Sequence, residues 1–180
     1  MNMFSYKKIM ISVLCFSWIA LSFAKTSVQS TPGRKTILGP VEVCGYGQYK
    51  NSVFEQRVNV NGKLDVIEVE FRKAISVNGS VLAKNSIFFE TVDVNGSMEA
   101  IGSHFENTIT FDGKLSLENS SAKEIIVANH NKKNQSTLIL KGATVVVGDI
   151  IFEGEPGTVE TKKGAKILGA VKNGKIITKR

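Results

Sequence analysis

Three stretches of the chain repeat one pattern of residues. Residues 58–64 read VNVNGKL, residues 75–81 read ISVNGSV, and residues 92–98 read VDVNGSM, so that the Asn-Gly pairs recur at the constant interval from Asn61 to Asn78 to Asn95, which is seventeen positions. A fixed short period of this kind is typical of proteins built from stacked repeats. The same interval, stepped outward, reaches Val43-Cys44-Gly45, Phe111-Asp112-Gly113 and Ala128-Asn129-His130.

The residues between these triplets align in the same register. This predicts six coils without insertion from Val41 to about Val145. A phenylalanine column lies nine positions after each Gly: Phe54, Phe71, Phe88, Phe105, Ala122 and Ile139. A serine-rich column lies seven after it: Ser52, Val69, Ser86, Ser103, Ser120 and Thr137. Four more columns, mostly apolar, flank the Gly: Val41, Val58, Ile75, Val92, Ile109 and Ile126; Val43, Val60, Val77, Val94, Phe111 and Ala128; Gly47, Leu64, Val81, Met98, Leu115 and Lys132; Tyr49, Val66, Ala83, Ala100, Leu117 and Asn134.

The apolar columns pair at every second position, which is the period of a strand and not of a helix. Val, Ile and Phe favour strands, and Asn-Gly is expected to break them. The sequence therefore predicts an all-β, single-domain parallel β-helix, or β-solenoid, with a seventeen-residue coil and three short strands per coil. Identical side chains would stack about 4.8 Å apart on successive coils. A right-handed sense is expected from the crossover preference of parallel strands.

Two other folds compete with this interpretation. A long helix would be interrupted by Asn-Gly once in every repeat. An array of antiparallel hairpins is the more serious alternative, because Asn-Gly is also the strongest two-residue hairpin signal. The hairpin array explains the turns but not the single register of the phenylalanine column, so we favour the solenoid.

The asparagine column precedes each glycine of the repeat. Asn tolerates the left-handed conformation and forms hydrogen-bonded ladders, so we expect these residues to line a sharp turn. Cys44 occupies the same column and is expected to be a residue at the end of the ladder. Four sites match the N-glycosylation pattern, at Asn78, Asn95, Asn119 and Asn134. For Asn78 and Asn95 we favour the structural role, since the repeat already explains them.

Residues 1–24 have the features of a secretory signal peptide. Lys7 and Lys8 precede an apolar run over residues 9–23, and Ser22-Phe23-Ala24 supplies small residues for cleavage. The apolar run is shorter than the roughly 20 residues that span a bilayer. We therefore expect export to the periplasm or the extracellular space, with residues 25–40 forming a linker or an N-terminal cap. No transmembrane segment is expected in the mature chain.

Composition sets further bounds. Residues 1–24 hold two of the 23 lysines and arginines and none of the 16 acids, so the charge without them is +5. This mild excess does not indicate nucleic acid as a partner. Only Cys44 would remain, so no internal disulfide is expected. Residues 146–180 echo the motif at altered spacing and are expected to form irregular closing coils. Their basic end could bind an anionic envelope polymer or polysaccharide, although a solvated, solubilising end is favoured.

No catalytic, cofactor-binding or metal-binding set can be assembled from the sequence. His104 and His130 have no His or Cys at ligand spacing, and both are expected at the surface or in a turn. Asp65, Glu68, Glu70 and Glu99 could share a face, as a polysaccharide-cleaving β-helix would require. Coils without insertions offer no walls for such a site, so we expect a protein that is not an enzyme. A carbohydrate-binding or polysaccharide-cleaving module is the alternative.

The segments Gly79-Ser80-Val81-Leu82-Ala83 and Gly96-Ser97-Met98-Glu99-Ala100 share a Gly-x-aliphatic-x-Ala pattern. With the seventeen-residue period, this resembles the bactofilins, a family of polymer-forming bacterial β-helix proteins, over about Val41 to Val145. The resemblance implies end-to-end assembly through the β-helix without a nucleotide cofactor. Together these observations predict an exported structural protein that associates with itself through its coil ends or binds a surface.

Overall fold

A computed structural model describes residues 28–31, 33–129, 136–162 and 164–179, and these contain strands and no helix. The predicted signal peptide and His130 lie outside the described residues. The strands are β1 Val28–Thr31, β2 Arg34–Ile37, β3 Val41–Phe54, β4 Val58–Phe71, β5 Ile75–Lys84, β6 Ile87–Phe88, β7 Val92–Ile101, β8 His104–Glu118, β9 Ser121–Asn129, β10 Thr137–Lys141, β11 Val145–Val146, β12 Ile150–Gly154, β13 Gly157–Lys162, β14 Lys166–Ile167, β15 Val171–Lys172 and β16 Gly174–Lys179.

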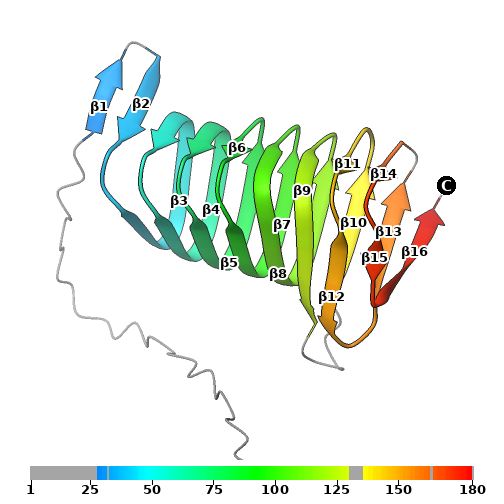
Figure 1. Cartoon of the computed structure of the whole chain (residues 1–180). Helices are drawn as coiled ribbons and strands as arrows, with labels where there is room; N and C mark the ends of the chain where they lie inside the picture. Colours follow the sequence, from blue (N-terminus) through cyan, green and yellow to red (C-terminus); the bar gives the residue numbers. More distant parts are fainter. Residues whose placement is uncertain (1–27, 32, 130–135, 163, 180) are drawn as a thin grey trace, which may run out of the picture.

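The strands wind into one elongated solenoid whose coils lie side by side (Figure 1). Every ladder within it is parallel, except that β1 pairs antiparallel with β2 at the N-terminal end. From β3 through β4, β5 and β7 to β8, each residue pairs with the equivalent residue of the next repeat, as Val60 does with Val77 and Val77 with Val94. The predicted parallel β-solenoid of seventeen-residue coils is therefore confirmed, and the antiparallel hairpin array is excluded.

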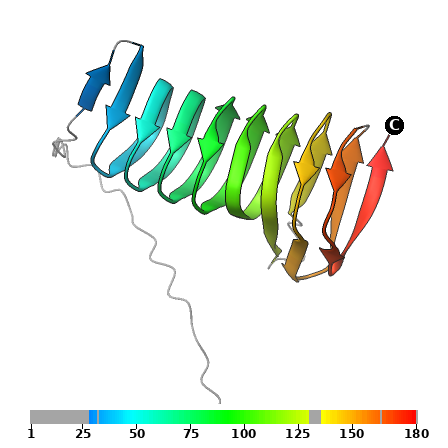
Figure 2. The same cartoon turned by 45° about the horizontal axis from the view of Figure 1, so that its top comes forward.

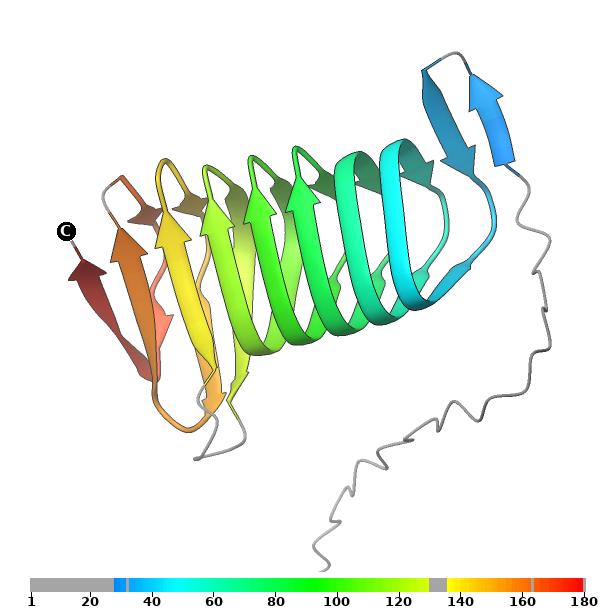
Figure 3. The ribbon, with the colours of Figure 1, turned by 180° about the vertical axis from the view of Figure 1, so that it is seen from behind.

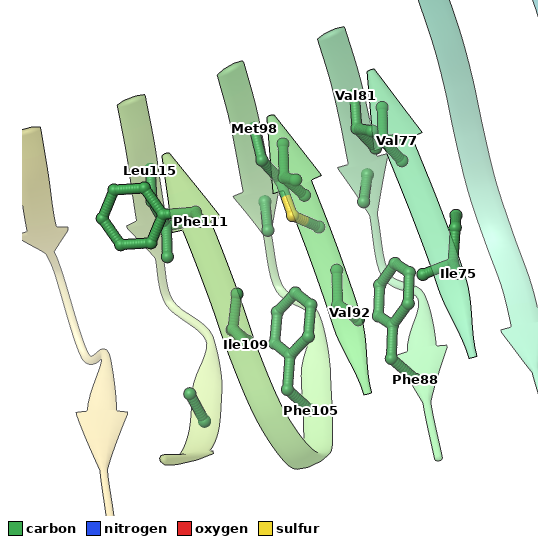
Figure 4. Close-up of a cluster of buried hydrophobic side chains, with 14 of the residues drawn as sticks. Ile75, Val77, Val81, Phe88, Val92, Met98, Phe105, Ile109, Phe111 and Leu115 are labelled. Atoms are coloured by element: carbon green, nitrogen blue, oxygen red, sulfur yellow. The ribbon is translucent and has the colours of Figure 1, made fainter. Parts of the chain in front are cut away.

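The phenylalanine column forms the centre of the core. Phe54, Phe71, Phe88 and Phe105 are all buried, and their rings stack nearly parallel, with centroids 5.0, 4.9 and 4.6 Å apart. Figure 4 shows two of these rings between the aliphatic side chains of neighbouring columns. The ring spacing is close to the separation of paired strands, about 4.8 Å, so the backbone ladder sets the aromatic stack.

The corner glycines allow one coil to lie against the next. Gly62, Gly79, Gly96 and Gly113 have φ between 126° and 141°, and a Cβ on any of them would lie 2.0–2.1 Å from the carbonyl oxygen of the preceding corner glycine. No other residue fits such a position. The expectation that Asn-Gly breaks the strand was wrong, because β4 and β5 continue through this corner.

The asparagines of the repeat have a different role from the one expected. Asn61, Asn78 and Asn95 are exposed, and their φ values are not positive. Because Asn78 and Asn95 are exposed, a glycan on either side chain would have room. The left-handed position lies six positions after the glycine instead, with φ between 49° and 60°, at Asn51, Glu68, Asn85, Gly102 and Asn119.

The serine column lies just after this left-handed corner and is buried. Ser103 Oγ accepts a hydrogen bond from Ser86 N at 3.2 Å, and Ser120 Oγ accepts one from Ser103 N at 3.1 Å. Each hydroxyl also donates to a carbonyl two positions earlier in its own coil, as Ser103 Oγ does to Ile101 O at 3.1 Å. Buried backbone groups that the turn leaves without a partner are thus satisfied by serine side chains.

The register changes after Phe105, which corrects the predicted columns. A bulge between Phe105 and Thr108 shifts the pairing of β8 with β9, and Leu115 then pairs with Leu138 instead of Lys132. The unbroken register predicted to about Val145 was therefore wrong. The residues that continue the columns are Ile125 in place of Ile126, Val127 in place of Ala128, Leu138 in place of Lys132, Leu140 in place of Asn134, Val146 in place of Ile139, and Thr144 in place of Thr137.

The physical reason is burial. Lys132 and Asn134 carry polar groups that an inward column cannot solvate, whereas Leu138 and Leu140 are fully buried. The following coils are longer than the repeat, since Ser121 pairs with Val145, Ile125 with Ile150, and Leu138 with Val159. The seventeen-residue interval returns only between β13 and β16, where Val159 pairs with Ile176.

The phenylalanine column continues through these longer coils. Its members along the whole solenoid are Ile37, Phe54, Phe71, Phe88, Phe105, Ala122, Val146 and Ile167. The column is aromatic in the middle of the stack and aliphatic at both ends.

Candidate functional site

The two ends of the solenoid differ from its interior in having strand edges without a neighbour. At the C-terminal end, β14, β15 and β16 each pair on one side only, with β11, β12 and β13, among the residues that the structure describes. Figure 3 shows β16 as the last strand, at the end opposite to β1 and β2. Its outer backbone N–H and C=O groups therefore face away from the molecule, where another strand could pair with them.

The C-terminal end also leaves part of the core uncovered. Ile176 continues an inward column formed by Leu115, Leu138 and Val159, which are all fully buried. Ile176 itself is 51% exposed, because no coil among the described residues lies beyond it. Apolar area therefore lies next to an unpaired edge, which is the combination expected of an association surface.

The same end is basic. Between residues 164 and 179 the chain has Lys166, Lys172, Lys175 and Lys179 and no acid. Lys172 Nζ lies 2.6 Å from Asp149 Oδ2, and Lys179 Nζ lies 2.7 Å from Glu160 Oε2, so two of these cations pair with the preceding coil. The hydrogen bonds from these lysines lower the pKa of the Asp149 and Glu160 carboxyls, and the bond to Asp149 raises the pKa of Lys172.

At the N-terminal end, residues 41–50 pair only with β4 within the described part of the chain. The ring of Tyr49 packs edge to face on Phe54, with centroids 4.9 Å apart, and lies over the position where Gly47 has no side chain. Burial raises the pKa of the Tyr49 hydroxyl. This end of the core is thus covered by one aromatic ring, while the backbone edge beside it stays open.

Each coil of the solenoid has three sides, and at the N-terminal end the third side, formed by the end of β3, is occupied. β2 pairs parallel with the end of β3, and Ile37 is buried in the phenylalanine column. β1 then pairs along the outer edge of β2, from Val28 opposite Ile37 to Thr31 opposite Arg34. Figure 2 shows this hairpin as the outermost layer of the N-terminal end. The part of residues 25–40 that the structure describes therefore includes a hairpin over one of three sides.

A shallow groove of about 390 Å³ lies on the side of the solenoid, where small serines replace longer outward side chains. Its rim carries Lys63, Lys114 and Glu99. Ser116 also lines it, and this residue is 5% exposed with a hydroxyl that makes no hydrogen bond within the described residues. Because this hydroxyl is buried beneath the surface, a ligand in the groove would contact the outward side chains around it and not the hydroxyl itself.

The four carboxylates considered from the sequence do not meet. Asp65 and Glu99 lie in one outward column, with Leu82 between them. Glu70 lies on another side, where its carboxylate is 2.5 Å from Arg34 Nη2, and Glu68 occupies the left-handed corner. Among the described residues, no group of three or more His, Cys, Asp or Glu side chains could hold a metal ion.

The remaining candidates lie at the surface. His104 is in an outward position as expected; its Nε2 lies 3.2 Å from Glu106 Oε1, and its Nδ1 contacts Ser121 Oγ. Cys44 is exposed and shares its column with Asn61, as predicted.

The end residues Gly47, Tyr49 and Ile176 were missed as functional candidates. In the sequence, Gly47 stands out as a glycine in a column otherwise filled by aliphatic residues and Met, whereas nothing distinguishes Ile176 from the other aliphatic members of that column.

The fold defines the chain as a protein of the parallel β-solenoid class. No protein-family model, curated protein or solved structure matches it. Within the described residues, no helix has the length and apolar character to cross a membrane.

Proposed function

We propose that this chain is an exported, non-enzymatic structural protein of the periplasm or the extracellular space that acts by associating with itself through the ends of its solenoid. The observation that carries this proposal is the open C-terminal edge, formed by β16, beside the half-exposed core residue Ile176. The N-terminal edge over residues 41–50 offers the second surface.

Physical reasoning supports end-to-end contacts over side-to-side contacts. A solenoid grows in one dimension, and each coil is stabilised mainly by its two neighbours. An unpaired strand edge is a ready template for another chain. The first and last coils are the only ones in the described stack that lack a neighbour on most of one side. The resemblance of residues 41–145 to the bactofilins favours the same mode of action.

The experiment compares the mature chain with two single variants of β16. Ile176→Asp places a charge on the uncovered core position, and Ile177→Asp is its matched control, because Ile177 is also partly exposed but lies in an outward column. Sedimentation velocity over a wide concentration range should show assemblies for the mature chain and for Ile177→Asp, and loss of assembly for Ile176→Asp. A mature chain that stays monomeric at every concentration would overturn the proposal.

A second candidate function rests on the side groove. Three lysines, Lys63, Lys114 and Lys141, line this groove together with Glu99, and this excess of cations favours an acidic polysaccharide as ligand. The basic C-terminal end could bind the same kind of anionic polymer. Isothermal titration with a polyuronate should give salt-sensitive binding that Lys63→Ala and Lys114→Ala weaken. Binding that neither substitution changes would rule out the groove and leave the C-terminal end.

A further inference from the structure

The solenoid has a direction, because all its coils run parallel. A contact between the C-terminal end of one copy and the N-terminal end of the next continues the parallel ladder without reversing it. A contact between two C-terminal ends would instead pair β16 antiparallel with itself. In the symmetric register centred on Ile177 this would set Lys175 of each copy opposite Lys179 of the other, and like charges placed directly opposite destabilise a strand pair.

The residue columns give the register of the head-to-tail contact. Continuing them across the junction sets Gly174 on Gly45, Ile176 on Gly47, and Thr178 on Tyr49. The exposed Ile176 and the small Thr178 would then both face the Tyr49 ring, which lies over the position of Gly47, so that apolar surface covers apolar surface.

The corner glycine at the N-terminal end fits the same register. A Cβ on Gly62, Gly79, Gly96 or Gly113 would strike the carbonyl oxygen of the coil before it. At Gly45 the corresponding space holds no atom within 4 Å. In the head-to-tail contact, the carbonyl oxygen of Gly174 from a second copy would occupy that space, as a corner carbonyl does in the coils behind it.

The third side of the solenoid presents a conflict. On the third side, the outermost strand of the receiving copy is β2, which leads directly into β3. When β16 of the incoming copy pairs with residues 45–50, β14 of that copy therefore comes to lie against the outer edge of β2. That edge is already paired with β1.

We propose that β1 is a releasable cap on the assembly site, and that a second copy of this chain displaces it by pairing β14 with β2 while β16 pairs with residues 45–50. This inference rests on the proposed self-association and adds its polarity and its regulation. Among the strands that the structure describes, β1 alone runs against the solenoid, so its removal continues the parallel repeat.

The exchange has a favourable balance for the assembled state. Release of β1 breaks its pairing with β2, which extends over the whole length of both short strands. Docking of a second copy replaces this pairing with that of β14 and adds the edges of β15 and β16 on the other two sides. Two copies therefore gain more pairing than they lose, but β1 has to leave first, which makes its release the controlling step.

The test locks or removes β1 in a Cys44→Ser background. In the locked variant, Ser30→Cys and Lys35→Cys lie directly opposite each other in the β1–β2 ladder, so a disulfide holds the cap closed and a reductant releases it. In the truncated variant the chain begins at Arg34. Sedimentation velocity should show the locked variant as a monomer when oxidised and as assemblies when reduced. The truncated chain should assemble at a lower concentration than the parent.

The outcomes separate the two proposals. If the oxidised variant assembles as readily as the reduced one, β1 is not a cap, although self-association stands. If every variant stays monomeric, the proposed function fails as well. Should the truncated chain not fold, as judged by circular dichroism, the oxidised and reduced forms of the locked variant still decide the question.

A cross-linking experiment tests the polarity. Tyr46 and Lys175 occupy the same outward column at opposite ends of one copy, so head-to-tail contact brings them together only between copies. One chain carries Tyr46→Cys and a second carries Lys175→Cys, both in the Cys44→Ser background with β1 removed. Mild oxidation should yield mixed dimers. A predominance of dimers joined through position 175 on both chains would overturn the head-to-tail arrangement.

Discussion

The interior coils and the last coil carry the same columns of residues, yet they differ in what covers them. Val159 is fully buried, whereas Ile176, one coil further along the same column, is 51% exposed. The side chains are nearly alike, so the difference comes from the missing neighbour and not from residue type. In a solenoid, burial depends on coils on both sides, and the ends therefore hold the apolar area that remains for a partner.

The largest effect that would test this contrast is expected at a corner glycine. Gly79→Ala sets a Cβ 2.0 Å from the carbonyl oxygen of Gly62, at a φ of 141°. Backbone on both sides of the contact has to move, so we expect a loss of about 4 kcal/mol or more in the free energy of unfolding. Urea denaturation followed by circular dichroism measures this loss.

Gly45→Ala is the matched control at the open end. Its φ of 95° is also left-handed, but a Cβ there meets no atom within 4 Å. Only the conformational strain remains, which costs about 1–3 kcal/mol. Equal losses for the two variants would show that the close approach between coils does not matter.

The next effect concerns the aromatic stack. Phe88→Ala and Phe71→Ala should each lower the free energy of unfolding by about 3–5 kcal/mol, because a buried ring leaves a cavity between two stacked neighbours. Phe89→Ala is the control, since this adjacent side chain points outward and is 40% exposed. Its loss should be much smaller than that of Phe88→Ala. A thermal midpoint that none of these variants changes would mean that the faces are misassigned.

A smaller effect is expected at the serine corner. Ser103→Ala removes the acceptor for Ser86 N and leaves a buried backbone donor unsatisfied, at a cost of about 1–3 kcal/mol. Ser97→Ala, on the exposed side of a neighbouring strand, should change the stability little. Thermal denaturation of both variants provides the measurement, and a Ser103→Ala variant as stable as Ser97→Ala would contradict the role of the ladder.

The sequence predicted the interior well and the ends poorly, for a physical reason. Each interior coil packs against coils of the same shape, so equivalent positions favour the same kind of residue. The inward positions of Val60, Val77 and Val94 are therefore visible as a repeat in the sequence. The glycine column was visible for the same reason, but its role as a close approach between coils depends on a φ above 120° that no spacing reveals. The left-handed column mixes Asn, Glu and Gly, and its members share a conformation more than a residue type.

The register after Phe105 could not be obtained by repeating the same step along the chain. The number of residues in a coil can change without loss of core packing when apolar side chains still fill the inward positions, as Leu138 and Leu140 do. A search for the next pair of apolar residues at alternate positions would have located them. The open edges themselves have no signature in composition, because they arise from where the stack stops.

The smallest effect we predict concerns the last coil and acidity. The pKa values of Asp149 and Glu160 lie below their ordinary values of 3.8 and 4.5, chiefly because of the hydrogen bonds from Lys172 and Lys179. A carboxyl whose pKa is lowered by folding stabilises the fold above its ordinary pKa. That contribution is lost as the pH falls through the lowered value. The last coil should therefore loosen below about pH 4.5. In the interior, the hydrogen bond from Lys73 likewise lowers the pKa of Glu90, but coils on both sides hold that region, so we expect it to loosen less.

Amide hydrogen exchange as a function of pH, corrected for the intrinsic rate, separates the two regions. With acidification, protection over β15 and β16 should fall more than protection over β5 and β7. In Asp149→Asn the pH dependence over β15 should largely disappear, because the neutral amide cannot titrate, and β15 should be less protected at neutral pH. If β5 lost protection in step with β15, the last coil would unfold together with the interior, and the contrast between end and interior would not extend to stability.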